Sequence, residues 1–495
     1  METFISNFNG GLQLFLSLSG MTTLLFGCMI GIIGGALPGL SPSTTVALLV
    51  PLSFKMDPAI GIAFLCSVYL ASNFGGSITA ITLNAPGTPA AAVTAIDGYH
   101  LAQKGHAKKA IDAALIASTF GGLIGIIILI TLATPLSEFA LKFDSASYCS
   151  LAAFGLLSVV LMNANKSKNI IAITLGILVK CVGLDPISGS NRFSFGLEEM
   201  YSGFQTIPAL IGLFAVSQIL IDLKLPLTIK IDTPKTKDIA AKDRWKLFFH
   251  EKFNILRSSI IGTIIGIFPG AGSTIAAFIS YDMAKAQSKQ KESFGKGSLK
   301  GVVASEAANS ASVGGALVPL LALGIPGSAT DAVLIGAFML HDINPGPLLM
   351  SEQIPIVYGI FSSLFLASIL IFILGLSSSK AFAKISHIEK NILYPIVLSL
   401  ALIGCYSINS SLFDAFTCLL FGVLGWILKT YSYPVSSVVL GMVLATMLEE
   451  NFRRALLENG LTSFLAPIPA TLLLLPIILF IIIKTIRQIF HLKTI

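Results

Sequence analysis

The sequence predicts an all-α protein that crosses a membrane many times, with roughly a dozen membrane segments. Hydrophobic residues make up 54% of the 495 positions and charged residues only 12%, about half the charge of a typical soluble domain. Apolar stretches long enough to cross a hydrocarbon core recur, for example at 110–136, 355–376 and 468–486. The alternating pattern of an outer-membrane barrel is not seen, so helices are the expected spanning elements.

Two sequence blocks recur in the same order, which predicts an internal repeat. GIIGGALPGLSPST at 31–44 recurs as GTIIGIFPGAGST at 262–274, and FGGSITAITLNAPGT at 74–88 resembles VGGALVPLLALGIPGS at 313–328. The order is kept, with a small length difference between the blocks. The residues matched in this way are Gly31 with Gly262, Gly35 with Gly266, Pro38-Gly39 with Pro269-Gly270, Gly75-Gly76 with Gly314-Gly315, and Pro86-Gly87 with Pro326-Gly327.

The basic residues indicate that the two repeats have opposite orientations in the membrane. Residues 1–97 hold a single lysine, Lys55, whereas the segment 224–257 before the second repeat is strongly basic. The ends are reversed, because repeat one runs into a lysine cluster at 104–109 and repeat two runs into 341–379, which has no lysine or arginine. Since basic loops stay in the cytoplasm, the pattern predicts an inverted-topology pair.

Basic residues on both sides of 258–284, with FPGAG near its middle, predict a re-entrant hairpin rather than one straight helix. We therefore predict four sections along the chain. They are a first repeat with flanking helices at 1–223, a cytoplasmic linker at 224–254, a second repeat at 255–390, and C-terminal helices at 391–495 that act as a possible scaffold.

The four Pro-Gly pairs are the predicted binding site. Each is followed by a serine or threonine, which suits the N-cap of the next helix. Four helix N-termini inside the membrane would offer free N–H groups and partial positive charge to a carboxylate, and nearby asparagines could add amides. The alternative is close helix packing, for which small residues also serve. The candidate substrate-binding residues are Gly39, Ser41, Ser43, Thr44, Asn73, Asn84, Gly87, Thr88, Gly270, Gly272, Ser273, Thr274, Asn309, Gly327 and Ser328.

Two carboxylates are candidates for binding the coupling ion. Glu306 lies in a stretch that otherwise has no charge, where an ionisable group is costly and usually functional. Asp331 follows the last Pro-Gly pair. Purely structural roles remain open for both, a hydrogen bond for Glu306 and a helix cap for Asp331. Backbone carbonyls near the broken helices could coordinate Na⁺. These carbonyls lie near Pro38, Pro86, Pro269 and Pro326.

Several longer strings resemble the large membrane subunit of the tripartite tricarboxylate transporter family. They include GIFPGAGSTIAAFISYDMAK, FGKGSLKGVVASEAANSASVGGALVPLLALGIPGSATDAVLIGAF and LEENFRRALLENG, and with the segments around residues 31–110 they extend from about residue 20 to 460. The family usually has glycine at Ser41, asparagine at Ser310 and proline at His100. Ser41 and Ser310 fall at candidate site positions, which weakens any claim that the substrate is citrate itself.

The resemblance implies a secondary active transporter in the bacterial inner membrane. It implies import of a tri- or dicarboxylate or a related organic anion, coupled to Na⁺ or H⁺, with no other cofactor. The implied partners are a small four-helix membrane subunit and a periplasmic solute-binding protein. The alternative class is a channel for small anions, which can also be built from broken helices. An enzyme is not expected because HExxH and GxSxG are absent, and the scattered cysteines indicate neither disulfides nor zinc. Nucleic acid is not an expected partner, since cytoplasmic loops explain the net charge of +7.

Overall fold

Helices make up nearly all of the described structure, as predicted. The computed structural model describes residues 2–37, 39–162, 165–223, 241–270, 272–385 and 390–465. Within these ranges eight helices are long and apolar enough to cross a membrane, and four shorter apolar helices accompany them. The eight candidate spans are Leu18–Ala36, Pro58–Leu83, Ala91–Ala140, Ser145–Met162, Leu299–Leu323, Ile354–Leu376, Leu412–Thr430 and Val435–Glu458. Part of the predicted linker and the apolar stretch at 468–486 lie outside the described residues.

The chain forms two compact units, of which the first holds both repeats. Unit 1 comprises Met1–Ser137 and Gln205–Val435. Its elements before the linker are α1 (Glu2–Leu16), α2 (Leu18–Ala36), α3 (Pro42–Ser53), α4 (Pro58–Leu83), α5 (Ala91–Leu101), a wide turn η1 (Ala102–His106), α6 (Ala107–Ala140), α9 (Thr206–Ile211), a second wide turn η3 (Gly212–Val216) and α10 (Ser217–Asp222). After the linker come α11 (Ala241–Ile267), α12 (Gly272–Gln287), η4 (Lys291–Ser293), α13 (Leu299–Leu323), α14 (Ala329–Leu340), α15 (Leu349–Glu352), α16 (Ile354–Ile385), α17 (Lys390–Asn409) and α18 (Leu412–Thr430).

Unit 2 comprises Glu138–Phe204 and Ser436–Ile495. Its described elements are α7 (Ser145–Met162), α8 (Lys166–Lys180), the short antiparallel strands β1 (Gly183–Leu184) and β2 (Asn191–Arg192), a turn η2 (Glu198–Met200), α19 (Val435–Asn459) and η5 (Gly460–Phe464). The four sections predicted earlier are consecutive ranges of residues, whereas these units are defined by contacts. The four sections therefore stay a prediction.

Ion pairs in unit 2 explain the string LEENFRR at 448–454. Asp185, at the start of the turn between β1 and β2, accepts a hydrogen bond from the Arg453 guanidinium at 2.6 Å. Arg192 forms an ion pair with Glu449 at 2.5 Å. The backbone N–H of Ser188, then Arg453 and the N–H of Ile187, hold the pKa of Asp185 well below its usual range. This part of the family-like sequence therefore has a structural role.

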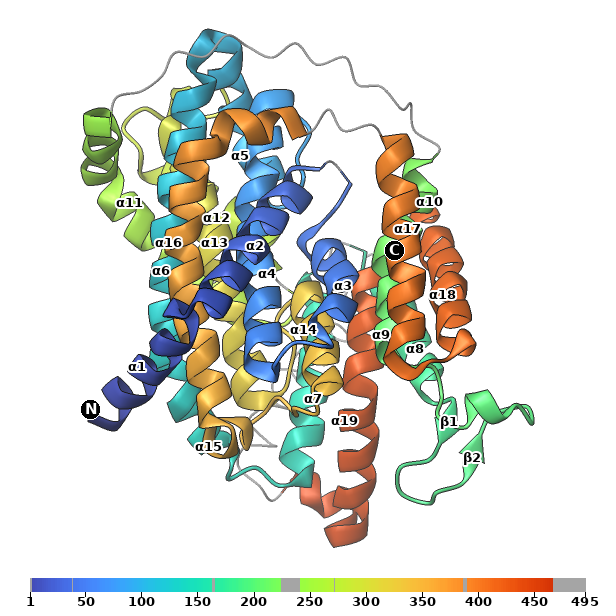
Figure 1. Ribbon diagram of the computed structural model, residues 1–495. Helices are drawn as coiled ribbons and strands as arrows, with labels where there is room; N and C mark the ends of the chain where they lie inside the picture. The colour runs from blue at the N-terminus through green and yellow to red at the C-terminus, as the bar shows by residue number, and fades with distance from the viewer. Residues whose placement is uncertain are drawn as a thin grey trace, which may run out of the picture. The chain divides into compact units, whose positions relative to one another are not determined.

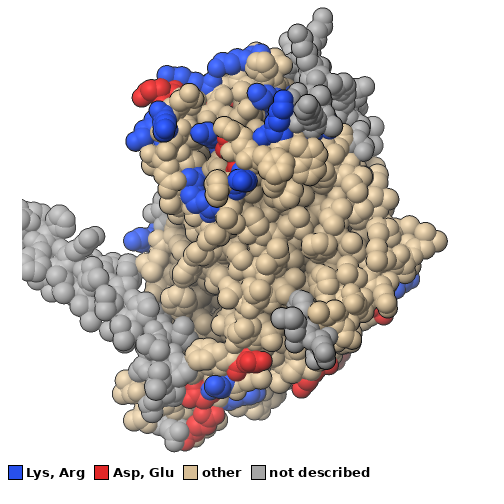
Figure 2. All heavy atoms as spheres, turned by 90° about the vertical axis from the view of Figure 1, so that its left-hand side faces the viewer, with Lys and Arg blue, Asp and Glu red and all other residues tan. Residues whose placement is uncertain are grey.

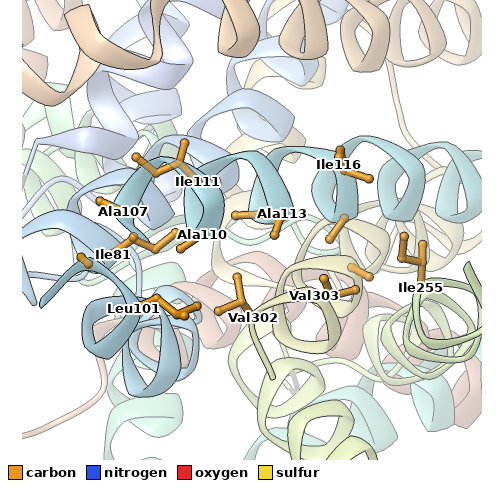
Figure 3. Close-up of a cluster of buried hydrophobic side chains, with 14 residues drawn as sticks. Ile81, Leu101, Ala107, Ala110, Ile111, Ala113, Ile116, Ile255, Val302 and Val303 are labelled. Atoms are coloured by element: carbon orange, nitrogen blue, oxygen red, sulfur yellow. The ribbon is translucent and has the colours of Figure 1, made fainter. Parts of the chain in front are cut away.

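Small residues bring the helices of unit 1 close together. Figure 3 shows side chains of α4, α5, α6, α11 and α13 meeting in one apolar cluster. Gly121 and Gly125 of α6 lie so close to α13 that an added methyl group would stand 2.5 Å from the carbonyl oxygens of Ala307 and Ala311. Such backbone contact is typical of membrane helices, where small residues form the interfaces.

The two repeats run in opposite directions through unit 1. Ser77 of α4 donates to Glu306 of α13, whereas Leu70 and Phe74, earlier in α4, line a small cavity with Ser310, later in α13. Earlier residues of α4 therefore lie beside later residues of α13, which means that the two helices are antiparallel (Figure 1). This is the arrangement predicted for an inverted pair.

The basic residues that flank both repeats lie at one end of unit 1. Lys104, at the end of the first repeat, donates to the carbonyl of Lys296, in the loop before α13, at 2.6 Å. Arg244, near the start of α11, pairs with Asp112 of α6 at 2.9 Å. Figure 2 shows lysine and arginine gathered there, and we call this end of unit 1 the basic end. At the other end, His341 after α14 lies 3.4 Å from Ser53 of α3.

We expect the basic end to face the cytoplasm, which single cysteines in a cysteine-free background can test. Gln103 and Gln290 are exposed at the basic end, and Asn344 is exposed in the loop after α14. An impermeant maleimide should label Asn344→Cys in intact cells, and should label Gln103→Cys and Gln290→Cys only after permeabilisation. Strong labelling of Gln290→Cys from outside would show that the assigned orientation is wrong.

Candidate functional site

The first break of each repeat is the tip of a helical hairpin. α2 and α3 form one hairpin, and α11 and α12 form the other. At the tips Gly39 has a φ of 97° and Gly270 a φ of 78°, in the left-handed region that glycine adopts without steric cost. Glycine is therefore required where the chain reverses. Pro38 and Ala271 lie outside the described residues, so the carbonyl predicted near Pro38 stays a prediction.

Three of the four predicted N-cap hydroxyls accept an amide hydrogen from the helix that follows. Each bond pairs one of the amides that a helix start leaves free. The pairs are Ser41 with the Thr44 N–H at 3.2 Å, Thr88 with the Ala91 N–H at 3.2 Å, and Ser328 with the Asp331 N–H at 3.3 Å. Ser273 and Thr274 lie half-buried in the first turn of α12, directly after Ala271.

The second breaks of the two repeats are equivalent residue by residue. Asn84 ends α4 and Gly324 ends α13, both in the left-handed conformation, with φ of 53° and 71°. The separation is the same for these C-caps and for the N-cap hydroxyls of Thr88 and Ser328, since 324 − 84 and 328 − 88 both give 240. Asn84 therefore ends its helix in the left-handed conformation, as Gly324 does in repeat two, and its side chain is not needed for this role.

The contacts shift one predicted match by one residue. A methyl group on Gly75 would stand 2.3 Å from the Ile32 carbonyl oxygen, and one on Gly315 would stand 2.2 Å from that of Thr263. Gly75 therefore corresponds to Gly315 and not, as the strings suggested, to Gly314. With this match, residues 74–88 correspond to residues 314–328 without a gap.

The two breaks of each repeat touch one another. In repeat one, a methyl group on Gly87 would stand 1.9 Å from the carbonyl oxygen of Gly35, in the last turn of α2. In repeat two, the N–H of Gly270 donates to the carbonyl of Gly327 at 3.0 Å. The pairing of breaks therefore rests on direct backbone contact, which only glycine permits at Gly87.

Contacts between the repeats join the breaks across the unit. The Tyr69 hydroxyl of α4 lies 3.1 Å from the Ser328 hydroxyl at the start of α14. The residue equivalent to Tyr69 in repeat two is Asn309, since 309 − 69 is again 240. Asn309 is fully buried, and neither its amide nitrogen nor its oxygen has a hydrogen-bond partner within the described structure. It lies close enough to Glu306 to interact with that carboxylate, so its amide belongs to the surroundings of Glu306.

Glu306 lies in a pocket of hydroxyl groups, fully shielded from solvent. Ser77 donates to Oε1 at 2.6 Å, Thr94 donates to the same oxygen through a short bond, and Ser118 donates to Oε2 at 3.0 Å. The donors come from α4, α5 and α6. Ser118 also lines the cavity of about 10 Å³ beside α4 and α13, enough for one water molecule.

Asp331 is also fully buried, but its environment differs. Among the residues described, no donor lies within hydrogen-bond distance of either carboxylate oxygen, but the side chain and backbone of Ser328 are near enough to act on the carboxylate. In the repeat alignment Asp331 corresponds to Ala91 of α5, and Glu306 corresponds to Cys66 of α4. Asp331 lies within electrostatic reach of Cys66. The equivalent interfaces α4–α14 and α13–α5 therefore each hold one buried carboxylate. In the first interface the shorter helix α14 carries it, as Asp331, and in the second the long helix α13 carries it, as Glu306.

The remaining predicted residues have local partners. The Ser41 hydroxyl lies 2.8 Å from that of Ser43 and 2.9 Å from that of Thr44. Asn73 donates to the carbonyl of Tyr69 at 3.2 Å, so it braces α4. Gly272, at the start of α12, has a φ of 60° and belongs to the reversal of the second hairpin.

The structure places a charged network at the first hairpin tip that was not predicted. A methyl group on Gly39 would stand 2.5 Å from Oδ2 of Asp222, a buried residue of α10. Asp222 accepts from Tyr394 at 3.0 Å and from Gln218 at 3.1 Å, and Lys429 of α18 donates to Gln218 at 3.0 Å. The basic side chain of Lys429 is therefore connected to the tip through Gln218 and Asp222.

Tyr69 and Ser77 were also missed, although the sequence carries a signal for them. Tyr69, Asn73 and Ser77 are spaced by four residues in an apolar helix, which places their polar groups on one face. Thr94 and Ser118 carry no such signal, because only the tertiary fold brings them to Glu306.

Broken helices, inverted repeats and buried carboxylates together define a multi-pass membrane transport protein. A family model for the tripartite tricarboxylate transporter TctA family matches residues 21–440. The chain belongs to this family. Transport proteins of this family are parts of tripartite systems, so the chain works with partner subunits.

Two curated relatives come from Agrobacterium vitis. An uncharacterized 52.8 kDa protein from the TAR-I ttuC' 3' region is 35% identical over 483 residues, covering 96% of this chain and 95% of the relative. An uncharacterized protein from the TAR-II ttuC' 3' region is 37% identical over 215 residues, covering 43% of this chain and 89% of the relative. No solved structure matches.

Proposed function

We propose that the protein imports a tri- or dicarboxylate, or a related organic anion, across the bacterial inner membrane. A Na⁺ or H⁺ gradient would drive this import. A periplasmic binding protein would deliver the anion, and a small membrane subunit would complete the system. Membership of the family supports the transport of an organic anion. The observation that carries the proposed mechanism is the pairing of capped helix N-termini across two inverted repeats.

The N-termini of α5 and α14 provide the polar groups that an anion requires. Thr88 and Ser328 cap these helices at equivalent positions, and a helix N-terminus attracts negative charge through its free N–H groups. The segments 258–284 and 301–379 contain no lysine or arginine. Backbone N–H groups, hydroxyls and the buried Asn309 amide are therefore proposed to hold the carboxylate, with the buried carboxylates binding the cation.

We expect Thr88→Ala and Ser328→Ala to weaken the apparent affinity for the transported anion by about tenfold each. A hydrogen bond to a charged group contributes roughly 1.5–3 kcal/mol, which corresponds to about ten- to a hundredfold in affinity. The measurement is uptake and counterflow of labelled citrate, succinate and tartrate in vesicles that contain the complete tripartite system. Exchange that is faster than net uptake would support a transporter, and its absence would favour a channel.

Ser17→Ala is the matched control for these variants. Ser17 caps α2 by accepting a hydrogen bond from the Gly20 N–H at 3.1 Å. Ser17→Ala therefore removes the same kind of capping bond, at a cost in stability of about 1 kcal/mol, but at a position away from the breaks. Lys55→Ala is a second control, because Lys55 is exposed in the loop between α3 and α4. If Lys55→Ala abolished uptake while the cap variants behaved as wild type, a side-chain cation would hold the anion instead.

A further inference from the structure

A second polar pocket lies at the basic end, away from the breaks. It has a volume of about 280 Å³ and opens between the middle of α11, the end of α12 and the start of α13. Its lining includes Arg257, Lys300, His250, Glu251 and Asn254. Nothing in the transport mechanism uses these residues.

The positive groups of the pocket are only partly neutralised. Arg257 donates to Gln287 and Asn254, both at 2.6 Å, but its Nε has no partner among the described residues. Lys300 is exposed, and in the described part of the chain its ammonium group has no hydrogen-bond or ion-pair partner. Two fixed positive charges thus remain at the rim.

One carboxylate limits the charge that the pocket accepts. Glu251 is buried, accepts from Asn254 at 3.0 Å, and lies 3.6 Å from the exposed imidazole of His250. With this carboxylate, the charges of Arg257 and Lys300 leave a net charge near +1. Such a pocket suits a single negative charge better than a dianion.

An exposed apolar stripe on α11 leads directly to the pocket. Its members recur every three or four residues and so share one helix face. They are Trp245, Phe249, Phe253, Leu256, Ile260 and Ile264, each at least 41% exposed. Phe253, which is 75% exposed, belongs to both the stripe and the pocket lining. A ligand with apolar chains and an anionic head would cover both surfaces.

We propose that the pocket binds the headgroup of an anionic phospholipid, a phosphate ester with one negative charge. The phosphate would lie between Arg257 and Lys300, and the acyl chains would follow the stripe on α11. Basic pockets at the cytoplasmic ends of membrane helices suit anionic lipid headgroups. Figure 2 shows the surrounding lysines and arginines, which would attract such lipids to this end.

The test uses a tryptophan placed in the pocket wall. The two native tryptophans, Trp245 and Trp426, are replaced by phenylalanine, and Phe253→Trp becomes the reporter. Brominated phosphatidylglycerol in nanodiscs of phosphatidylcholine should quench it with at least tenfold higher relative affinity than brominated phosphatidylcholine. Arg257→Gln with Lys300→Gln should reduce this preference about tenfold, as expected for the loss of charged hydrogen bonds.

Lys289→Gln is the control, because Lys289 is exposed in the next loop but does not line the pocket. It should leave the preference unchanged. Equal quenching by both lipids, or an equal loss of preference in the control, would overturn the proposal. Millimolar inorganic phosphate should not displace the lipid, and full displacement would identify a free anion as the occupant instead.

Discussion

Alanine at Gly87 is expected to reduce the initial rate of anion uptake by about a hundredfold at matched expression. The added methyl group would stand 1.9 Å from the Gly35 carbonyl oxygen and 2.9 Å from the Gly76 Cα atom. Both neighbours are backbone atoms, so the clash cannot be relieved by rotating a side chain. The break must move away from α2, and a displacement of about 1 Å in a binding site costs on the order of a hundredfold in rate.

Gly327→Ala, the equivalent change in repeat two, should have a smaller effect in the same direction. Its methyl group would stand 2.8 Å from Ala316 Cα and 2.9 Å from the Gly266 carbonyl oxygen. This variant keeps the prediction testable if Gly87→Ala fails to fold. Gly10→Ala is the control, since nothing lies within 4 Å of the added carbon. Normal uptake by a well-folded Gly87→Ala protein would show that contact between the breaks is unnecessary.

The breaks could be predicted because their causes are local. Proline ends a helix, glycine permits the left-handed conformation at Gly39 and Gly270, and a following hydroxyl caps the next helix. The orientation of the repeats could also be predicted, because lysine and arginine mark the ends of membrane segments. These features require no knowledge of which helices touch.

The residues that complete the site could not be predicted, because their partners are distant in sequence. Thr94 and Ser118 reach Glu306 across 212 and 188 positions. The matching of Gly75 with Gly315 depends on which glycine faces the first helix of its repeat, and adjacent glycines in the strings hide this choice. Asp222 meets the tip at Gly39 only after α9 and η3, which precede α10, have packed beside α3.

Glutamine at Glu306 is expected to keep the fold and to reduce gradient-driven uptake more than tenfold. The glutamine oxygen can still accept from Ser77 and Thr94, and the Ser118 hydroxyl can rotate to accept from the new amide. The hydrogen-bond network therefore survives, and the charge is lost. If Glu306 binds the coupling cation, Glu306→Gln should retain counterflow of the anion while losing its response to a Na⁺ or pH gradient.

Two further variants separate cation binding from packing. Asp331→Asn removes the charge of the second fully buried carboxylate, so it should also uncouple uptake. Ser305→Ala is the control, because Ser305 touches Thr94 at 2.9 Å but not the carboxylate. It should leave the dependence on both gradients unchanged. If Glu306→Gln matched wild type in uptake and in its response to Na⁺ and pH, Glu306 would have a structural role, and Asp331 alone would remain as the candidate cation ligand.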